Sequence, residues 1–291
     1  MIENIVKSNA IASWLECKGR ASRLAVVMAV AFVFILLSPA AQSNELRETF
    51  NAHDKHGEKS FDHMAWNTLL GRYLHAGNDG LNRLDYAGLK KSGRPALNAY
   101  VQSLEAVNPS ALTVAEQFSF WTNLYNAKTA QIVISHYPVA SIRDIKLSLN
   151  PFAGPWRAKV VKVQGHELSL DDIEHKILRP VWNDPRIHYA VNCASVGCPN
   201  LAMKAYTGRN LETMLDVAAR DYINSPRGVE FDNGRIIVSS LYDWYGSDFG
   251  DGQREILAHI ARYAEPALAK RLKNVSDFDD FAYDWMLNDK K

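Results

Sequence analysis

The sequence has no excess of either charge and few cysteines. Its 291 residues contain 33 Lys and Arg against 32 Asp and Glu, and a formal net charge of +1 is not expected of a protein that binds nucleic acid or coats an anionic membrane. Hydrophobic residues make up 47% of the chain, which excludes disorder as its main feature and suffices for a sizeable core. The function must therefore lie in a particular site, and we expect no nucleic-acid partner.

Several familiar catalytic motifs are also absent. The chain has no GxSxG, HExxH, P-loop or GxGxxG sequence, so serine α/β-hydrolases, zincins, P-loop nucleotide hydrolases and Rossmann dehydrogenases lose their main sequence support. Neither an internal repeat of about 20 to 50 residues nor a Gly/Ser-rich or Pro-rich linker divides it. We expect one domain without a cofactor or a metal.

A long apolar run lies near the N-terminus. Residues Leu24 to Leu37 are apolar, follow four basic residues and precede small residues at Ala41 and Ser43, which is the three-part pattern of a secretory signal. At about 1.5 Å per residue the run spans roughly 21 Å, less than the roughly 30 Å hydrocarbon core. We predict a cleaved signal peptide over residues 1–43 and a periplasmic or secreted protein. An uncleaved segment is the alternative, and would be its sole membrane contact.

Residues 44–291 mix helical and extended patterns without a regular βαβ alternation, which favours a single α+β domain. Thr113 and Glu116 form a capping box before a helix that we expect to reach about His136. The aromatic residues along this helix predict that it is largely buried. The expected architecture is a long buried helix packed on a mainly antiparallel sheet.

Short extended pieces supply the strands of that sheet. Hairpins are predicted around Gln164-Gly165 and around Asp232-Asn233-Gly234, because such residues favour tight turns. We also predict a buried strand over Arg186 to Cys193 and a final strand over Phe281 to Asn288.

Cys193 is the most informative residue of the chain. It lies where the predicted strand meets a Gly/Pro loop, and His188 is its nearest candidate base. A straight strand would turn these two side chains, five residues apart, to opposite faces, so a bend would be needed. Three roles remain open for Cys193. They are a disulfide with Cys198, favoured by an oxidising compartment, a reactive thiol, and a metal ligand, the last weakened by the lack of a C-x2-C pair.

The predicted long helix carries further candidates. Asn123 and Asn126 lie three residues apart and share one face, and buried amides need partners. They could orient a catalytic histidine, donate to an oxyanion or bond the backbone of a neighbouring loop. Glu116 has the same ambiguity, since its place in the capping box is a sufficient explanation.

Aromatic residues cluster in two stretches of the chain. They either pack together or line a cleft for a peptide or a sugar. The candidates for cleft lining are Trp121, Tyr125, Trp244 and Tyr245.

These stretches resemble the domain-of-unknown-function family 547, with a family-like core at about residues 84–288. The resemblance implies a papain-like or transglutaminase-like thiol-hydrolase fold. It further implies Cys193 as nucleophile, His188 as base, and Glu116, Asn123 or Asn126 as the orienting group. The matching pieces are Phe120–Ala127, Ser141–Ile145, Ser169–Arg179, Arg186–Pro199, Ser240–Tyr245 with Asp248-Phe249, and Tyr283–Asn288.

Two functions follow as expectations. The first is an exported thiol-dependent hydrolase or acyl transferase, of amidase or peptidase type, acting on envelope substrates. The second is a non-catalytic envelope module that binds a peptide or a glycan and is closed by a Cys193–Cys198 disulfide.

Overall fold

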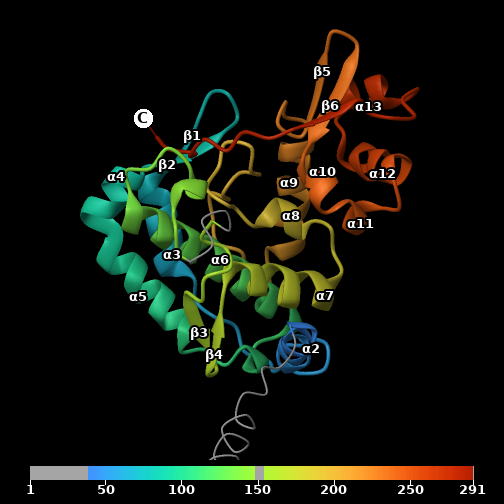
Figure 1. Cartoon of the computed structure of the whole chain (residues 1–291). Helices are drawn as coiled ribbons and strands as arrows, with labels where there is room; N and C mark the ends of the chain where they lie inside the picture. The colour runs from blue at the N-terminus through green and yellow to red at the C-terminus, as the bar shows by residue number, and fades with distance from the viewer. Residues whose placement is uncertain (1–38, 148–153, 291) are drawn as a thin grey trace, which may run out of the picture. The chain divides into compact units, whose positions relative to one another are not determined.

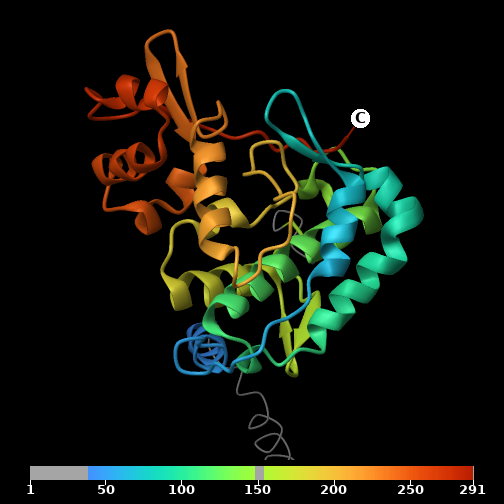
Figure 2. The same ribbon diagram turned by 180° about the vertical axis from the view of Figure 1, so that it is seen from behind.

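In the computed structural model, helix α6 (Val114–His136) begins and ends where the sequence predicts. Thr113 Oγ1 accepts a hydrogen bond from Glu116 N at 3.3 Å, and the chain leaves the helix at Tyr137 in extended backbone. Trp121 is fully buried, as are most residues on every side of the helix. A helix that is apolar all round belongs in the interior, and Figures 1 and 2 show α6 crossing the middle of the fold.

The structure describes residues 39–147 and 154–290. Asn44–Lys291 group into one compact unit. The apolar run of the predicted signal peptide lies outside the described residues, and helix α2 (Pro39–Thr49) is the first described element. Within the described ranges, no helix combines the length and the hydropathy that a membrane crossing requires.

Helices of the first half cover one side of α6. Helix α5 (Arg94–Glu105) buries Leu97, Val101 and Leu104, whose spacing of three or four residues forms one apolar stripe. This stripe packs against α6. The other elements here are α3 (Met64–Tyr73), β1 (Leu74–Ala76), β2 (Asn82–Leu84), α4 (Tyr86–Gly88), η1 (Leu89–Gly93), η2 (Pro109–Ala111) and η3 (Ile142–Asp144).

The middle of the chain begins with the predicted hairpin. Strands β3 (Val161–Val163) and β4 (His166–Leu168) pair antiparallel, and Gln164 and Gly165 form the turn with positive φ, as expected for a two-residue connection. The next helical segment starts with reciprocal bonds between Ser169 and Asp172. It comprises η4 (Asp172–Leu178), wound as a π-helix, and α7 (Arg179–Trp182).

The prediction of a buried strand over Arg186 to Cys193 is wrong. Residues Ile187–Ala190 form the short helix α8, and the chain becomes extended only at Val191. Asp184 starts this turn, because its Oδ1 accepts a hydrogen bond from Arg186 N at 2.9 Å. A run of only four buried residues has no period that distinguishes a strand from one helical turn.

The last third of the chain forms a second apolar cluster beside the first. Helix α9 (Leu211–Ile223) is followed by β5 (Val229–Asp232) and β6 (Arg235–Ser239), which pair antiparallel, while β7 (Asp280–Ala282) pairs parallel with β6. The predicted final strand is therefore present only at its start. The remaining helices are α10 (Leu241–Trp244), α11 (Gly246–Phe249), α12 (Gln253–Tyr263) and α13 (Pro266–Leu272).

The α+β fold class is confirmed. A long buried helix lies among shorter helices, and the pairing in the described residues is mainly antiparallel. The strands do not form a single large sheet, because they are distributed over two two-stranded sheets and one three-stranded sheet. Most of the surface of α6 is consequently covered by helices and loops.

The buried amide of Asn123 should contribute measurably to stability. It donates to Tyr206 O at 2.7 Å and accepts from Tyr206 N at 3.1 Å. Asn123→Ala leaves both backbone groups unpaired, so we expect the free energy of unfolding to fall by about 2–4 kcal/mol in urea titrations. Asn98→Ala, at an exposed position of α5, is the matched control and should change it by less than about 0.5 kcal/mol. Equal effects of the two substitutions would contradict this role.

Candidate functional site

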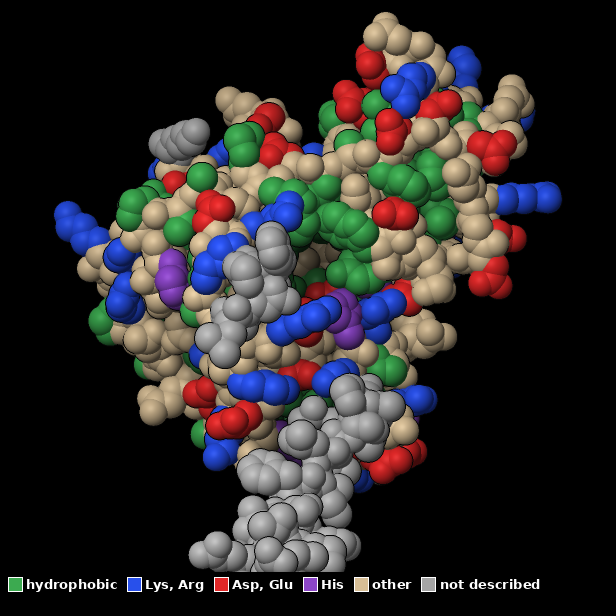
Figure 3. Space-filling model, in the orientation of Figure 1, with side chains coloured by type: hydrophobic (Ala, Val, Ile, Leu, Met, Phe, Trp, Pro, Cys, Tyr) green, Lys and Arg blue, Asp and Glu red, His purple; other side chains and the backbone are tan. Residues whose placement is uncertain are grey.

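A cavity of about 530 Å³ opens where the middle and the last third of the chain meet. Its lining includes both cysteines, Cys193 and Cys198, and several aromatic side chains. In Figure 3 this face is hollowed between hydrophobic side chains on one side and basic and histidine side chains on the other. A concave site with an apolar wall and a few convergent polar groups is the usual form of a ligand site. The titratable residues that line it are Asp171, Glu174, His175 and His188, with Arg143 and Arg157.

Helix α6 positions the segment that carries Cys193. Asn126 Nδ2 donates to Ala190 O at 3.0 Å, and its Oδ1 accepts from Asn192 N at 2.8 Å. Asn192 continues the chain of bonds, since its Oδ1 accepts from Ala194 N. Of the roles considered for the helix amides, Asn126 therefore bonds the backbone of a neighbouring loop. It acts on the cysteine loop and not on the ring of His188.

The turn after Cys193 is strained. Ala194 has a φ of 65°, a value in the left-handed region that a residue with a Cβ rarely adopts. Strain of this kind persists where the surrounding structure enforces it, and it concentrates at functional sites. Here the turn brings the Ser195 backbone and hydroxyl groups to the Cys193 sulfur.

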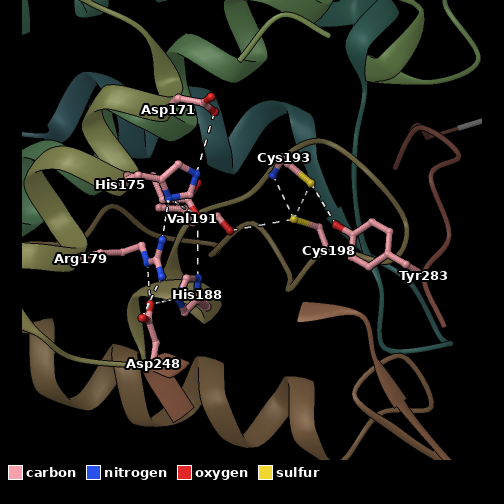
Figure 4. A network of polar contacts seen from close by, with 10 residues as sticks. Asp171, His175, Arg179, His188, Val191, Cys193, Cys198, Asp248 and Tyr283 are labelled. Atoms are coloured by element: carbon pink, nitrogen blue, oxygen red, sulfur yellow. Dashed lines mark hydrogen bonds and ion pairs between the residues drawn. The ribbon is translucent and has the colours of Figure 1, made fainter. Parts of the chain in front are cut away.

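The sulfur of Cys193 has three polar neighbours. Its Sγ lies 3.0 Å from Cys198 Sγ, 3.2 Å from Ser195 Oγ and 3.1 Å from Tyr283 OH. Figure 4 shows Cys198 and Tyr283 converging on it. Both cysteines are free thiols in this structure, so the Cys193–Cys198 disulfide stays a prediction.

These neighbours favour the thiolate. The hydrogen bond from Cys198, helped by those from Ser195 and Tyr283, outweighs burial and lowers the pKa of Cys193 to about 7. Burial raises the pKa of Cys198 well above its ordinary value. Cys193 is half-buried on the cavity and Cys198 is 4% exposed, so Cys193 is the more accessible thiol of the pair as well as the one with the lowered pKa.

His188 belongs to a second polar cluster. Its Nε2 lies 2.7 Å from Asp248 Oδ2, and its Nδ1 lies 3.7 Å from Glu174 Oε1. The ring stacks on Tyr245 with centroids 4.2 Å apart. Asp248 is held from the other side by Arg179 in a bidentate pair at 2.5 and 2.8 Å. Although burial raises the pKa of Asp248, the bonds from His188 and Arg179 hold it well below its usual range.

The two clusters face one cavity without a bond between the sulfur and the imidazole. Figure 4 shows Cys193 and Tyr283 in one group and His188 with Asp248 in the other. Both ring nitrogens of His188 face carboxylates, and His188 is not among the polar neighbours of Cys193. The geometry therefore does not provide the direct base that the sequence suggested.

The other candidates from the sequence fall into two groups. Tyr125, Trp244 and Tyr245 line the cavity. Trp121 does not, because it is fully buried against Phe50 with ring centroids 4.9 Å apart. Asn123 pairs with the Tyr206 backbone. Glu116 lies beside Gly208 near the start of α6 and is not part of the cavity lining.

Sequence reasoning missed several residues of the site. Asp248 holds His188, Arg179 holds Asp248, and Tyr283 bonds the Cys193 sulfur. Each of them lies in a segment that carries the family resemblance, as does Glu174. The sequence motifs therefore contained these residues, but the order of the residues did not indicate which motifs lie next to each other in the fold.

Hydrogen bonding by Tyr283 should control the titration of Cys193. Because the thiolate is the reacting form, alkylation of Cys193 by iodoacetamide should rise with pH around a pKa of about 7 and then level off. Tyr283→Phe removes a donor to the thiolate, so the pKa of Cys193 should move upward and the rate near pH 7 should fall severalfold.

Peptide mass spectrometry measures this rate at Cys193 alone. Tyr137→Phe is the matched control, since the Tyr137 hydroxyl bonds Asp289 and does not line the cavity. A profile for Tyr283→Phe that coincides with that of the unmodified chain would show that Tyr283 does not stabilise the thiolate.

The comparisons with known proteins agree with the resemblance noted from the motifs. Residues 109–223 match the family model described as "Protein of unknown function, DUF547". Neither the curated proteins nor the solved structures include a match to this chain. The matched segment contains α6, η4, α8 and the cysteine loop, whereas Asp248 and Tyr283 lie beyond it. Over residues 109–223, the chain is therefore similar to the DUF547 family of proteins of unknown function.

Proposed function

We propose that this protein is an exported thiol-dependent hydrolase or acyl transferase, of amidase or peptidase type, with Cys193 as its nucleophile. The observation that carries the proposal is the setting of the Cys193 sulfur. It lies on a cavity large enough for a ligand, and its three polar neighbours lower the pKa of Cys193 to about 7. These hydrogen bonds favour the thiolate near neutral pH without a contribution from an imidazole.

The proposed reaction has two steps. The Cys193 sulfur bonds to the carbonyl carbon of an amide or an ester, and the bond from that carbon to the leaving nitrogen or oxygen breaks. The leaving group takes up a proton. Water or another nucleophile then displaces the acyl group from sulfur and regenerates the thiolate.

Proton transfer is assigned to the Glu174–His188 pair. Both residues line the cavity, and Glu174 Oε1 lies 3.7 Å from His188 Nδ1. This nitrogen has no hydrogen-bond partner in the described part of the chain. Asp248, fixed by Arg179, bonds the other ring nitrogen and holds the ring in place. Such a pair can exchange a proton with substrate while Cys193 supplies the nucleophile.

An aromatic wall supports a substrate of peptide or glycan type. Trp244 stacks on Trp285 with centroids 5.5 Å apart, and Trp156 meets Trp285 edge-on at 5.8 Å. Arg143 lies over the Trp285 ring. Trp244 is 43% exposed, so part of this wall is open to a ligand. The signal pattern at residues 1–43 supports action in the periplasm or outside the cell.

The same wall favours a second candidate function. A module that only binds would use the aromatic side chains and would need no reactive sulfur. The two functions are separated by whether Cys193 forms a covalent adduct with an acyl donor.

Cys193 should become acylated by an activated ester. We use the full chain with Cys17→Ser, so that Cys193 and Cys198 are its remaining cysteines. With p-nitrophenyl acetate near pH 7, we expect a burst of p-nitrophenolate and one acetyl group on Cys193 by peptide mass spectrometry. Cys193→Ala in the same background should lose both. If Cys193 is acetylated no faster than N-acetylcysteine, the enzyme proposal is wrong and the binding module remains as the candidate function.

The role of Glu174 should depend on the leaving group. Glu174→Gln removes a proton carrier, so release of a poor leaving group, such as the amine of a p-nitroanilide, should slow by about 100-fold or more. The acylation burst with p-nitrophenyl acetate should persist, because p-nitrophenolate leaves without a proton. Asp171→Asn, at another carboxylate of the cavity, is the matched control. Equal losses with both substrates would indicate a structural role for Glu174.

A further inference from the structure

The loop from Cys193 to Cys198 is held so that its two sulfurs stay together. Val196 N donates to Met286 O and Gly197 N to Asp284 O, both at 2.8 Å. The Tyr222 hydroxyl donates to Gly197 O at 2.7 Å. Bonds from two different segments thus fix this short loop. Because the loop is fixed on both sides, its two sulfurs are held 3.0 Å apart.

The two sulfurs also differ in access. Both residues line the cavity, but Cys193 is half-buried, whereas Cys198 is 4% exposed and lies against Cys193 and the backbone of Val191. The hydrogen bonds that lower the pKa of Cys193 do not act in the same way on Cys198, whose pKa is raised by burial. An accessible thiolate beside a buried thiol is the arrangement that thiol–disulfide exchange needs.

We propose that Cys193 and Cys198 are a redox-active dithiol that exchanges with the disulfides of peptide substrates entering the cavity. This activity is separate from acyl transfer, because it requires both sulfurs and no carbonyl substrate. Cys193 is the attacking sulfur, and Cys198 is the resolving sulfur.

The exchange proceeds in two balanced steps. The Cys193 thiolate bonds to one sulfur of the substrate disulfide, whose S–S bond breaks, and the released thiolate takes up a proton. Cys198 then gives up its proton and bonds to Cys193 Sγ, which releases the second substrate thiol. Two electrons pass from the dithiol to the substrate, and the Cys193–Cys198 disulfide is the product. The reverse sequence oxidises a substrate dithiol.

Most polar contacts of Cys198 are made with Cys193. Its sulfur lies 3.0 Å from Cys193 Sγ, accepts a hydrogen bond from Cys193 N at 3.0 Å and lies 4.0 Å from Val191 O. Its thiol is also the donor that lowers the pKa of Cys193 most. A purely packing role would be served equally well by an apolar side chain of similar size. Cys198→Val keeps the volume and removes the resolving sulfur. It also removes the hydrogen bond to Cys193, so Cys193 should still form the mixed disulfide, but more slowly near pH 7.

The test uses glutathione disulfide as the probe and the full chain with Cys17→Ser, fully reduced and then freed of reductant. We expect the intact mass to fall by two hydrogens, with two glutathione thiols released per chain. A glutathione adduct should not accumulate, because Cys198 resolves it. In Cys198→Val, one glutathione should remain attached to Cys193. In Cys193→Ser, oxidation should be lost, because the buried Cys198 does not react.

Three outcomes would overturn the proposal. The first is a stable glutathione adduct on Cys193 in the parent chain. The second is a reaction of Cys198 in Cys193→Ser that is as fast as that of Cys193 in the parent chain. The third is no oxidation of the parent chain at a pH at which N-acetylcysteine reacts with glutathione disulfide. Cys198→Ala serves as a second variant if the valine perturbs folding, which near-ultraviolet circular dichroism monitors. The acetylation burst, measured in parallel, reports acyl transfer separately, so failure of either activity is seen without the other.

Discussion

The pairing of buried side-chain amides with backbone is the interaction on which the site depends. Asn126 in α6 satisfies one carbonyl and one amide on either side of Val191, and Asn123 does the same for Tyr206. A buried backbone group without a partner is costly, so these bonds dictate where the chain may run. The segment that leaves α8 is thereby held against α6, and Cys193, the residue after Asn192, lies at the cavity.

The charges in the cavity are divided between two separate polar clusters, one around Cys193 and one around His188. Around Cys193 the neighbours are donors that carry no formal charge, so the thiolate is stabilised by hydrogen bonds. Around His188 the neighbours are carboxylates, balanced by Arg179. Each cluster satisfies its own charges, which is the condition for burying them. In the function that we propose, a substrate between the clusters meets the nucleophile on one side and the proton carrier on the other.

One sulfur serves both chemistries that we propose. Cys193 can attack a carbonyl carbon only while it is a free thiolate, and the same thiolate is what attacks a disulfide. Closure of the bond to Cys198 would remove the nucleophile from the cavity. The oxidation state of the loop therefore determines which reaction is open, and the 3.0 Å separation of the sulfurs means that closure needs little movement.

The sequence by itself determined the features that are encoded locally. The N-cap at Thr113, the length and burial of α6 and the hairpin at Gln164-Gly165 follow from side chains a few residues apart. The Glu116 half of the predicted capping box is not formed, because Thr113 N donates to Lys59 O. The matched family segment confirms the resemblance. It also predicted Cys193 and His188 as candidate residues, and both line the cavity. The structure of Ile187–Ala190 was not determined in this way, since a run of four buried residues is compatible with either a strand or a helical turn.

Only the tertiary structure decided which groups meet. Tyr283 reaches Cys193 from 90 residues away, and Asp248 reaches His188 from 60 residues away. No local pattern encodes such a distance, because it results from packing the last third of the chain against α8 and the cysteine loop. For the same reason Asp248, and not Asn126, proved to be the partner of the histidine. The sequence names the reactive side chains, while the fold selects their neighbours and thereby their chemistry.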